Sequence, residues 1–312
     1  MKPALGIGVR AVALALARRF AAPAVLSGVC MLAASPAGQE PGLTITHAAR
    51  SLQPGEAVVI EVRSPEPLQA LTGRAFGRDL RFVEVTPGRW QAVTGIDLDV
   101  APGPQVAGVR AHAPSGPVSQ EYRVAVAPKQ FGTRTLKVDP RFVTPPKSAL
   151  PRIERERARV AEAFRSGRPG RYWTLPFEAP VEAKAVSSFG VRSVFNGTPR
   201  DPHGGADLAS PEGAPVSAPN DGRVALAANH YFAGNMVLID HGAGVFSVLA
   251  HLSRIDVDEG AIVRRGDPVG LVGRTGRVTG PHLHWAARVG GARVDPYSLL
   301  AVTAQADAAS RQ

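Results

Sequence analysis

Turn-forming residues divide this chain into short segments along its whole length. The 312 residues include 33 Gly and 28 Pro, and 44% of the residues are apolar. Between turn pairs such as Pro54-Gly55 and Pro87-Gly88 lie runs rich in β-branched residues, as in 57–62. Short runs of this kind bounded by Gly and Pro are typical of antiparallel strands. The sequence therefore predicts a mainly β fold, and its apolar content excludes a charged disordered chain.

The first 37 residues have the organisation of a secretory signal peptide. Four basic residues lie within residues 1–19, and an apolar run, 20–34, follows and leads into small residues up to Ala37. This run is about 15 residues long and contains Pro23, whereas a membrane-spanning helix needs roughly 20 apolar residues. We therefore expect an exported protein of the periplasm or cell envelope, or a secreted one, that meets the membrane only through this segment.

Beyond this segment, the pattern predicts two β regions joined by a linker. Residues 43–128 contain about seven short runs at the spacing of an immunoglobulin-like β-sandwich. The linker, 129–180, is Pro-rich and contains one helix at about 150–165. The second β region, 181–300, is followed by a flexible tail, 301–312. The expected apolar face of the linker helix consists of Leu150, Ile153, Val160 and Phe164.

Charge and cysteine content restrict the partners and the type of metal site. The net charge is +10, from 36 Lys and Arg against 26 Asp and Glu. This balance favours a polyanionic environment, for which nucleic acid and bacterial wall polymer are candidates. The basic residues form no dense run, which argues against a nucleic-acid-binding arm. The single cysteine, Cys30, lies in the N-terminal apolar run, so any metal elsewhere must be held by His and carboxylate.

Six of the eight histidines lie between His203 and His284, inside the second β region. His203 and Asp207 are four residues apart with two glycines between them, and Zn²⁺ accepts such nitrogen and oxygen ligands. His282 and His284 stand at i and i+2, so on a strand both side chains face one site. His251 stands at the end of an apolar strand. It is a fifth candidate because the other four candidate residues lie in the same β region.

These three motifs, in their order and approximate spacing, resemble the lysostaphin/LytM-type zinc metallopeptidases, which are peptidoglycan endopeptidases. The resemblance covers about residues 181–296 and includes the flanking segments 187–192, 218–222 and 273–276. It implies an antiparallel β metallopeptidase domain over 181–300. One departure is Leu249, where the family usually has an aromatic residue; it leaves the shape of the substrate groove open but not the metal chemistry.

The resemblance also implies the roles of the site residues. It makes His203, Asp207 and His284 the ligands of one Zn²⁺ per chain. His251 and His282 remain as catalytic residues, which take the water proton, donate to the leaving amine or stabilise the oxyanion. The sequence leaves open which of the two is the general base.

The function implied is a secreted zinc metalloendopeptidase that hydrolyses peptide cross-links of bacterial peptidoglycan, with no nucleic-acid partner. The alternative is a non-enzymatic LytM-type regulator that activates a cell-wall amidase. Family members of that kind have lost zinc ligands, whereas all three are present here. A D-Ala-D-Ala dipeptidase or carboxypeptidase of related zinc geometry would have a longer His-to-Asp spacing and a later Glu-x-x-His, and the sequence has neither.

Overall fold

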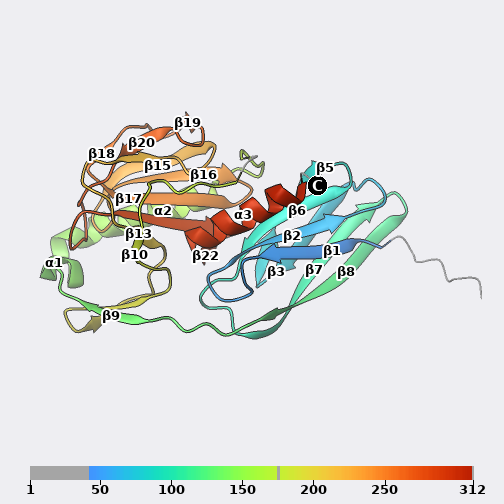
Figure 1. Cartoon of the computed structure of the whole chain (residues 1–312), viewed down its shortest axis with the longest axis horizontal. Coiled ribbons are helices and arrows are strands. Elements are labelled where there is room, and N and C mark those ends of the chain that lie inside the picture. The colour runs from blue at the N-terminus through green and yellow to red at the C-terminus, as the bar shows by residue number, and fades with distance from the viewer. Residues whose placement is uncertain (1–41, 174–175, 311–312) are drawn as a thin grey trace, which may run out of the picture. The chain divides into compact units, whose positions relative to one another are not determined.

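The computed structural model describes residues 42–173 and 176–310, and these are mainly β (Figure 1). The strands pair in antiparallel fashion, except for one parallel pair that joins the linker to the C-terminal region. Within the two ranges, no helix has the length and apolar character that crossing a lipid bilayer requires. The predicted signal peptide, 1–37, lies outside the described residues.

The N-terminal region consists of two four-stranded antiparallel sheets, ordered β1-β2-β6-β5 and β4-β3-β7-β8. Both contribute to one apolar core that includes Ile60, Ile96 and Val109. The immunoglobulin-like character of this region stays a prediction. The strands are β1 (Thr44–Ala49), β2 (Ala57–Arg63), β3 (Ala70–Ala75), β4 (Arg78–Leu80), β5 (Val83–Thr86), β6 (Arg89–Gly95), β7 (Gly103–Ala113) and β8 (Gly116–Val126).

The linker contains more structure than the single helix that the sequence predicts. Strand β9 (Thr133–Leu136) pairs in parallel with β11 (Arg192–Phe195), and a short helix, α1 (Pro140–Val143), and a 3₁₀ turn, η1 (Lys147–Ala149), follow. Helix α2 (Leu150–Arg165) then buries Ile153 and Ala163. Val160 and Phe164 pack as predicted, but Leu150 is 50% exposed because it stands at the first turn, beyond the sheet contact.

The C-terminal region is built on an eight-stranded antiparallel sheet in the order β10-β13-β21-β17-β16-β15-β19, with β22 paired to β21. One face packs on the small sheet β14-β20-β18, and the opposite face carries α2. The large sheet comprises β10 (Ala185–Ser187), β13 (Ala206–Leu208), β15 (Gly222–His230), β16 (Gly234–Gly242), β17 (Val245–Leu252), β19 (Ile262–Val263), β21 (Leu283–Val289) and β22 (Ala292–Val294). The remaining strands are β12 (Thr198–Pro199), β14 (Pro215–Ser217), β18 (Arg254–Ile255) and β20 (Pro268–Leu271).

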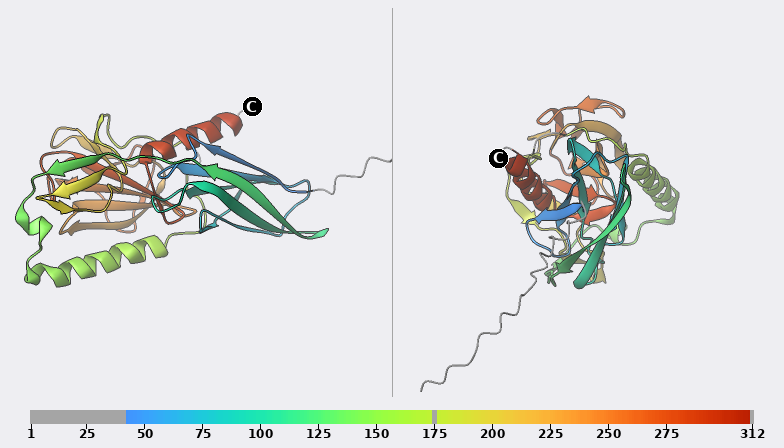
Figure 2. Two further views of the ribbon diagram at one scale, coloured as in Figure 1. Left: turned by 90° about the horizontal axis from the view of Figure 1, so that it is seen from below. Right: turned by 90° about the vertical axis from the view of Figure 1, so that its right-hand side faces the viewer.

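Where the sequence predicts a flexible tail, the described residues form helix α3 (Pro296–Ser310). Leu299 and Val302 are fully buried in a cluster with Val289 of β21. The Thr303 hydroxyl donates to the carbonyl of Leu299 and accepts from the backbone N–H of Phe177. In both views of Figure 2, strands of the C-terminal region lie between α2 and α3.

Candidate metal centre and active site

Two residues of the candidate metal centre lie on neighbouring strands of the large sheet. Asp207 on β13 stands directly opposite His284 on β21. Opposite residues of an antiparallel pair share a face with their Cβ atoms about 5 Å apart, and here His284 Nδ1 lies 2.9 Å from Asp207 Oδ1. The alternation of β21 sends Leu283 into the core on the other face. The sheet therefore brings one imidazole and one carboxylate together without help from a loop.

His203 reaches this pair from the loop before β13. Its backbone N–H donates to the carbonyl of Val191, and its Nδ1 lies 3.2 Å from the carbonyl of Ser188. A carbonyl only accepts, so Nδ1 can hold the ring proton there when a metal takes the lone pair of Nε2. Gly205 permits the close turn, because a Cβ there would lie 2.4 Å from the carbonyl oxygen of Trp285. Of the two glycines between His203 and Asp207, the second, Gly205, is therefore required because no larger residue fits.

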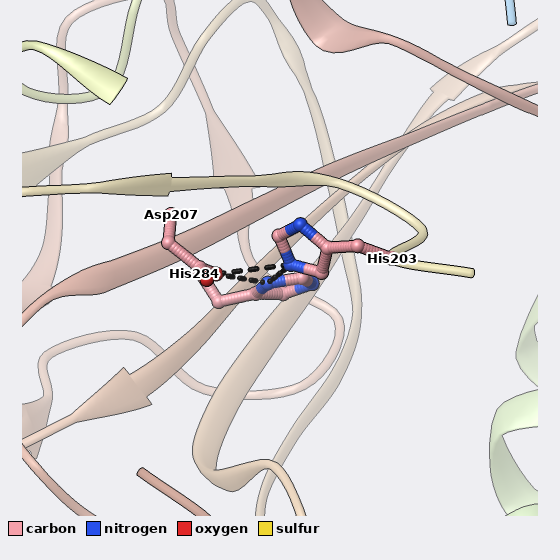
Figure 3. A group of neighbouring side chains, drawn as sticks. All are labelled: His203, Asp207 and His284. Atoms are coloured by element: carbon pink, nitrogen blue, oxygen red, sulfur yellow. Dashed lines mark hydrogen bonds and ion pairs between the residues drawn. The ribbon is translucent and has the colours of Figure 1, made fainter. Parts of the chain in front are cut away.

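Three ligand-type atoms converge in this way (Figure 3). His203 Nε2 lies 3.0 Å from Asp207 Oδ1 and 3.1 Å from His284 Nδ1. Around a tetrahedral zinc with bonds of 2.0–2.1 Å, neighbouring ligand atoms are about 3.3 Å apart. The triangle thus needs to open by only a few tenths of an ångström. The residues present fit a zinc ion with three protein ligands and one open position.

His282 and His251 lie beside this triangle. His282 Nε2 is 3.7 Å from Asp207 Oδ1, so His282 and His284 face one site as their spacing predicts. The ring of His251 lies 5.0 Å from that of His282 and 5.9 Å from that of His284, between ring centroids. All five predicted residues therefore meet at one place.

His251 reaches the site through a β-bulge. The register between β16 and β17 shifts at this point, and His251 has a φ of 66°, in the left-handed region. Simple alternation would turn its side chain away from the face that holds Ala250 and His284, which are opposite one another. The extra residue of the bulge re-aims the side chain. This strained conformation had no signal in the sequence.

Backbone carbonyls fix the protonation pattern of both flanking imidazoles. Nδ1 of His282 lies 2.9 Å from the carbonyl of Gly280, and Nδ1 of His251 lies 2.9 Å from that of Thr275. Each Nδ1 therefore carries the proton, and each Nε2 presents a lone pair. Burial lowers the pKa of His251 to about 3, with the neighbouring imidazoles acting in the same direction. His251 is thus neutral at physiological pH.

The ligand set has the ionisation that a metal requires. Burial alone would raise the pKa of Asp207, but hydrogen bonds with His203 and His284 outweigh it and hold the pKa far below its ordinary value. Burial also lowers the pKa of His284. The carboxylate is charged and the His284 imidazole neutral near pH 7, which are the forms that bind zinc.

The site opens into a cavity of about 1110 Å³ with a wall that the sequence did not predict. Linker residues of β9, α1 and α2 line it together with the five site residues. Arg134 of β9 contacts the centre directly, with its Nη2 3.4 Å from Asp207 Oδ2. Residues 133–136, Thr-Arg-Thr-Leu, alternate in the way that is typical of a strand. Because they lie in a Pro-rich segment that we interpret as a linker, the prediction from sequence places no strand there.

Leu249 does not shape this cavity. It is fully buried in the core behind the sheet, opposite Trp285 on β21, and Val248 and Ala250 line the cavity instead. Residue 249 faces the other side of β17, so this departure from the family pattern does not alter the cavity wall.

The other histidines lie outside the centre. His241 is fully buried, donates to the carbonyl of Asp221 and accepts from the Ser247 hydroxyl, and burial lowers its pKa to about 4. His47 bonds to the Tyr122 hydroxyl at 2.5 Å, and His112 is exposed on β7. The buried Nε2 of His230 has no hydrogen-bond partner in the described part of the chain.

Comparisons with known proteins agree with this geometry. The model of peptidase family M23 matches residues 201–296, which include all five site residues. Peptidoglycan DD-endopeptidase ShyA of Vibrio cholerae is 45% identical over 119 residues, covering 37% of this chain and 28% of that protein. DD-carboxypeptidase/endopeptidase Mpg of Neisseria meningitidis is 45% identical over 111 residues, covering 35% and 26%. The match thus spans less than a third of these relatives.

A solved structure extends the similarity beyond the metal centre. The crystal structure of a Pseudomonas aeruginosa protein assigned to peptidase M23 is 34% identical, with a TM-score of 0.62. The alignment covers 81% of this chain and 96% of that one. Since this similarity spans most of both chains and the family model contains the converging His, Asp and His side chains, the protein described here belongs to peptidase family M23.

Proposed function

We propose that this protein is a zinc metalloendopeptidase that hydrolyses peptide cross-links of bacterial peptidoglycan. The observation that carries the proposal is the triangle of His203 Nε2, Asp207 Oδ1 and His284 Nδ1, with sides of 2.9–3.1 Å. Two further imidazoles stand beside it with their Nε2 lone pairs available. A non-catalytic relative has no need of a complete ligand set with proton acceptors beside it.

The triangle would hold the zinc, and the flanking imidazoles would handle protons. When bound, zinc lowers the pKa of a water to roughly 7 and polarises a carbonyl. His282 and His251 each present Nε2 to accept the proton of the attacking water or, once protonated, to donate to the leaving amine. The carbonyls of Gly280 and Thr275 keep both rings in that tautomer and orientation. Arg134, close to Asp207 Oδ2, would hold the carboxylate in its coordinating position.

Three observations support peptidoglycan as the substrate. The matched relatives from Vibrio and Neisseria are a peptidoglycan DD-endopeptidase and a DD-carboxypeptidase/endopeptidase. The cavity is large enough for an extended peptide. The net charge of +10 favours retention on an anionic wall, an attraction that salt weakens. We propose export to the periplasm or cell envelope on the basis of the N-terminal segment.

Digestion of purified peptidoglycan sacculi tests the function. We expect the full chain to convert cross-linked muropeptide dimers to monomers, as measured by mass spectrometry, and a zinc chelator to stop the conversion. His284→Ala should abolish it, whereas His112→Ala, which removes an exposed histidine remote in sequence from the centre, should leave it unchanged. Release of free glycan strands only when a wall amidase is added would instead indicate the amidase-activating regulator.

A further inference from the structure

Arg277 lines the same cavity as the metal centre but has no acidic partner. Its guanidinium carbon lies 5.0 Å from the ring centre of Phe195 and 5.1 Å from that of Phe232. The side chain makes no hydrogen bond or ion pair within the described residues. Stacking on aromatic rings is a common way to hold a guanidinium group while leaving its N–H donors available.

The backbone around Arg277 is held in place. Its N–H donates to the carbonyl of Phe232 at 2.8 Å, and the Thr275 hydroxyl donates to the carbonyl of Leu252 at 2.7 Å. Gly276 has a φ of 75°, and a Cβ there would lie 2.4 Å from the nitrogen of Gly234. The same loop provides the carbonyl that orients His251. Arg277 is therefore fixed relative to the catalytic imidazoles.

A second arginine belongs to the same cavity. Arg200, three residues before His203, also lines the cavity. Its Nη2 donates to the carbonyl of Val143 at 2.6 Å, and its Nε is buried without a hydrogen-bond partner. Burial, together with the charge of Arg200, lowers the pKa of Arg277. Two cations thus line one cavity, each with part of its guanidinium group away from water.

The other arginines of the cavity are paired. Arg134 contacts Asp207 at 3.4 Å, and Arg157 contacts Glu154 at 3.9 Å. No ion pair joins Arg200 or Arg277 to a carboxylate in ranges 42–173 and 176–310. Uncompensated charges away from water are costly, and guanidinium groups bind carboxylates through paired N–H donors.

We propose that Arg277 and Arg200 form a subsite that binds a free carboxylate of the substrate peptide. The proposal deepens the function above and depends on the cavity being the peptide-binding site. It predicts preference for acidic peptides over peptides of the same length with amidated carboxyl groups. It assigns the two arginines to substrate positioning and specificity, not to bond cleavage.

Equilibrium binding tests the subsite separately from cleavage. The probes are a fluorescently labelled peptidoglycan monomer with a tetrapeptide stem and the same monomer with its carboxyl groups converted to amides. For the zinc-loaded full chain, we expect Arg277→Gln to weaken binding of the carboxylate probe about tenfold or more and to leave the amide probe unchanged. The control Arg110→Gln removes an equal charge from an exposed arginine of β7, outside the cavity, and should change neither Kd by more than about twofold.

Two further variants, Arg277→Lys and Arg200→Gln, keep the test valid if Arg277→Gln fails to fold. Lys keeps the charge and should recover part of the preference, while Arg200→Gln should reduce it with thermal unfolding unchanged. Equal weakening of both probes, or no weakening, in Arg277→Gln would overturn the subsite. If the protein prefers the carboxylate probe but does not cleave sacculi, the proposed function is refuted and the subsite is retained. If it cleaves sacculi but shows no preference between the probes, the subsite is refuted and the proposed function is retained.

Discussion

Replacing Asp97 with Ala should destabilise the fold through one buried ion-pair network. Asp97, 2% exposed, follows β6 and accepts from Arg293 Nε at 2.8 Å, from the Arg293 backbone N–H at 3.0 Å and from Arg78 Nη2 at 3.0 Å. These bonds connect the N-terminal region to β22. Removing one partner of a buried ion pair costs about 3–5 kcal/mol. The arginine side chains are 27% and 29% exposed and regain some water, so we expect a loss of about 3 kcal/mol.

Urea unfolding followed by circular dichroism measures this loss. Asp79→Ala is the matched control, because Asp79 is an exposed carboxylate with no ion pair in the described part of the chain, and it should change the free energy of unfolding by less than about 0.5 kcal/mol. A loss below about 1 kcal/mol for Asp97→Ala would refute the reasoning, since it would show that water replaces the carboxylate at little cost.

The pH dependence of stability gives a second measure of the Asp97 network. Burial opposes the shift, but hydrogen bonds and charge from Arg293 hold the pKa of Asp97 below its ordinary value of 3.8. A lowered native pKa means that the unfolded state binds the proton more readily. The stabilisation is therefore complete above roughly pH 5 and is lost as the pH falls through the native pKa. The difference in the free energy of unfolding between wild type and Asp97→Ala should therefore close as the pH falls over that range.

Three further outcomes follow from the structure. Ala at His203 or Asp207 removes one of three ligands, so zinc measured by mass spectrometry should fall from one per chain to nearly none and cleavage should cease; full activity without metal would contradict the mechanism. Ala at His282 or His251 should retain zinc and lower kcat on cross-linked muropeptides by roughly 10²- to 10⁴-fold; loss of zinc would mean that the residue is a ligand. Leu299→Ala should cost about 2–4 kcal/mol in urea unfolding, because Leu299 is fully buried, and a cost below 1 kcal/mol would show that α3 contributes little.

The parts of the site that local geometry determines were predictable from the sequence. His282 and His284 face one site because side chains two apart on an extended chain share a face. The His203 to Asp207 spacing also predicted convergence, since the glycines permit a close turn. The mainly β character followed from short runs between turn residues, and the linker helix from its apolar periodicity.

The parts that depend on distant segments were not predictable in the same way. The bulge that turns His251 arises from the register between β16 and β17, which no local pattern specifies. Strand β9 exists because β11 offers it a partner almost 60 residues later in the chain. Helix α3 was missed because its alanines suggested a small, polar tail, although alanine favours helices. Its stability comes from packing of Leu299 and Val302, spaced three apart, against β21.

Two parts of the chain form the cavity, and only one of them lies in the segment that the M23 family model matches. Its floor is the metal centre on the large sheet, within the segment that the M23 family model matches. Its wall comes from the linker, outside that segment, and includes Arg134, Phe142 and Ile153. Backbone pairing of β9 with β11, and packing of Ala163 of α2 on the large sheet, fix the wall against the floor. The floor provides the residue types that peptide hydrolysis needs, and the wall adds shape and charge around the same peptide. Differences in linker sequence are therefore a direct route to differences in substrate preference on an unchanged metal centre.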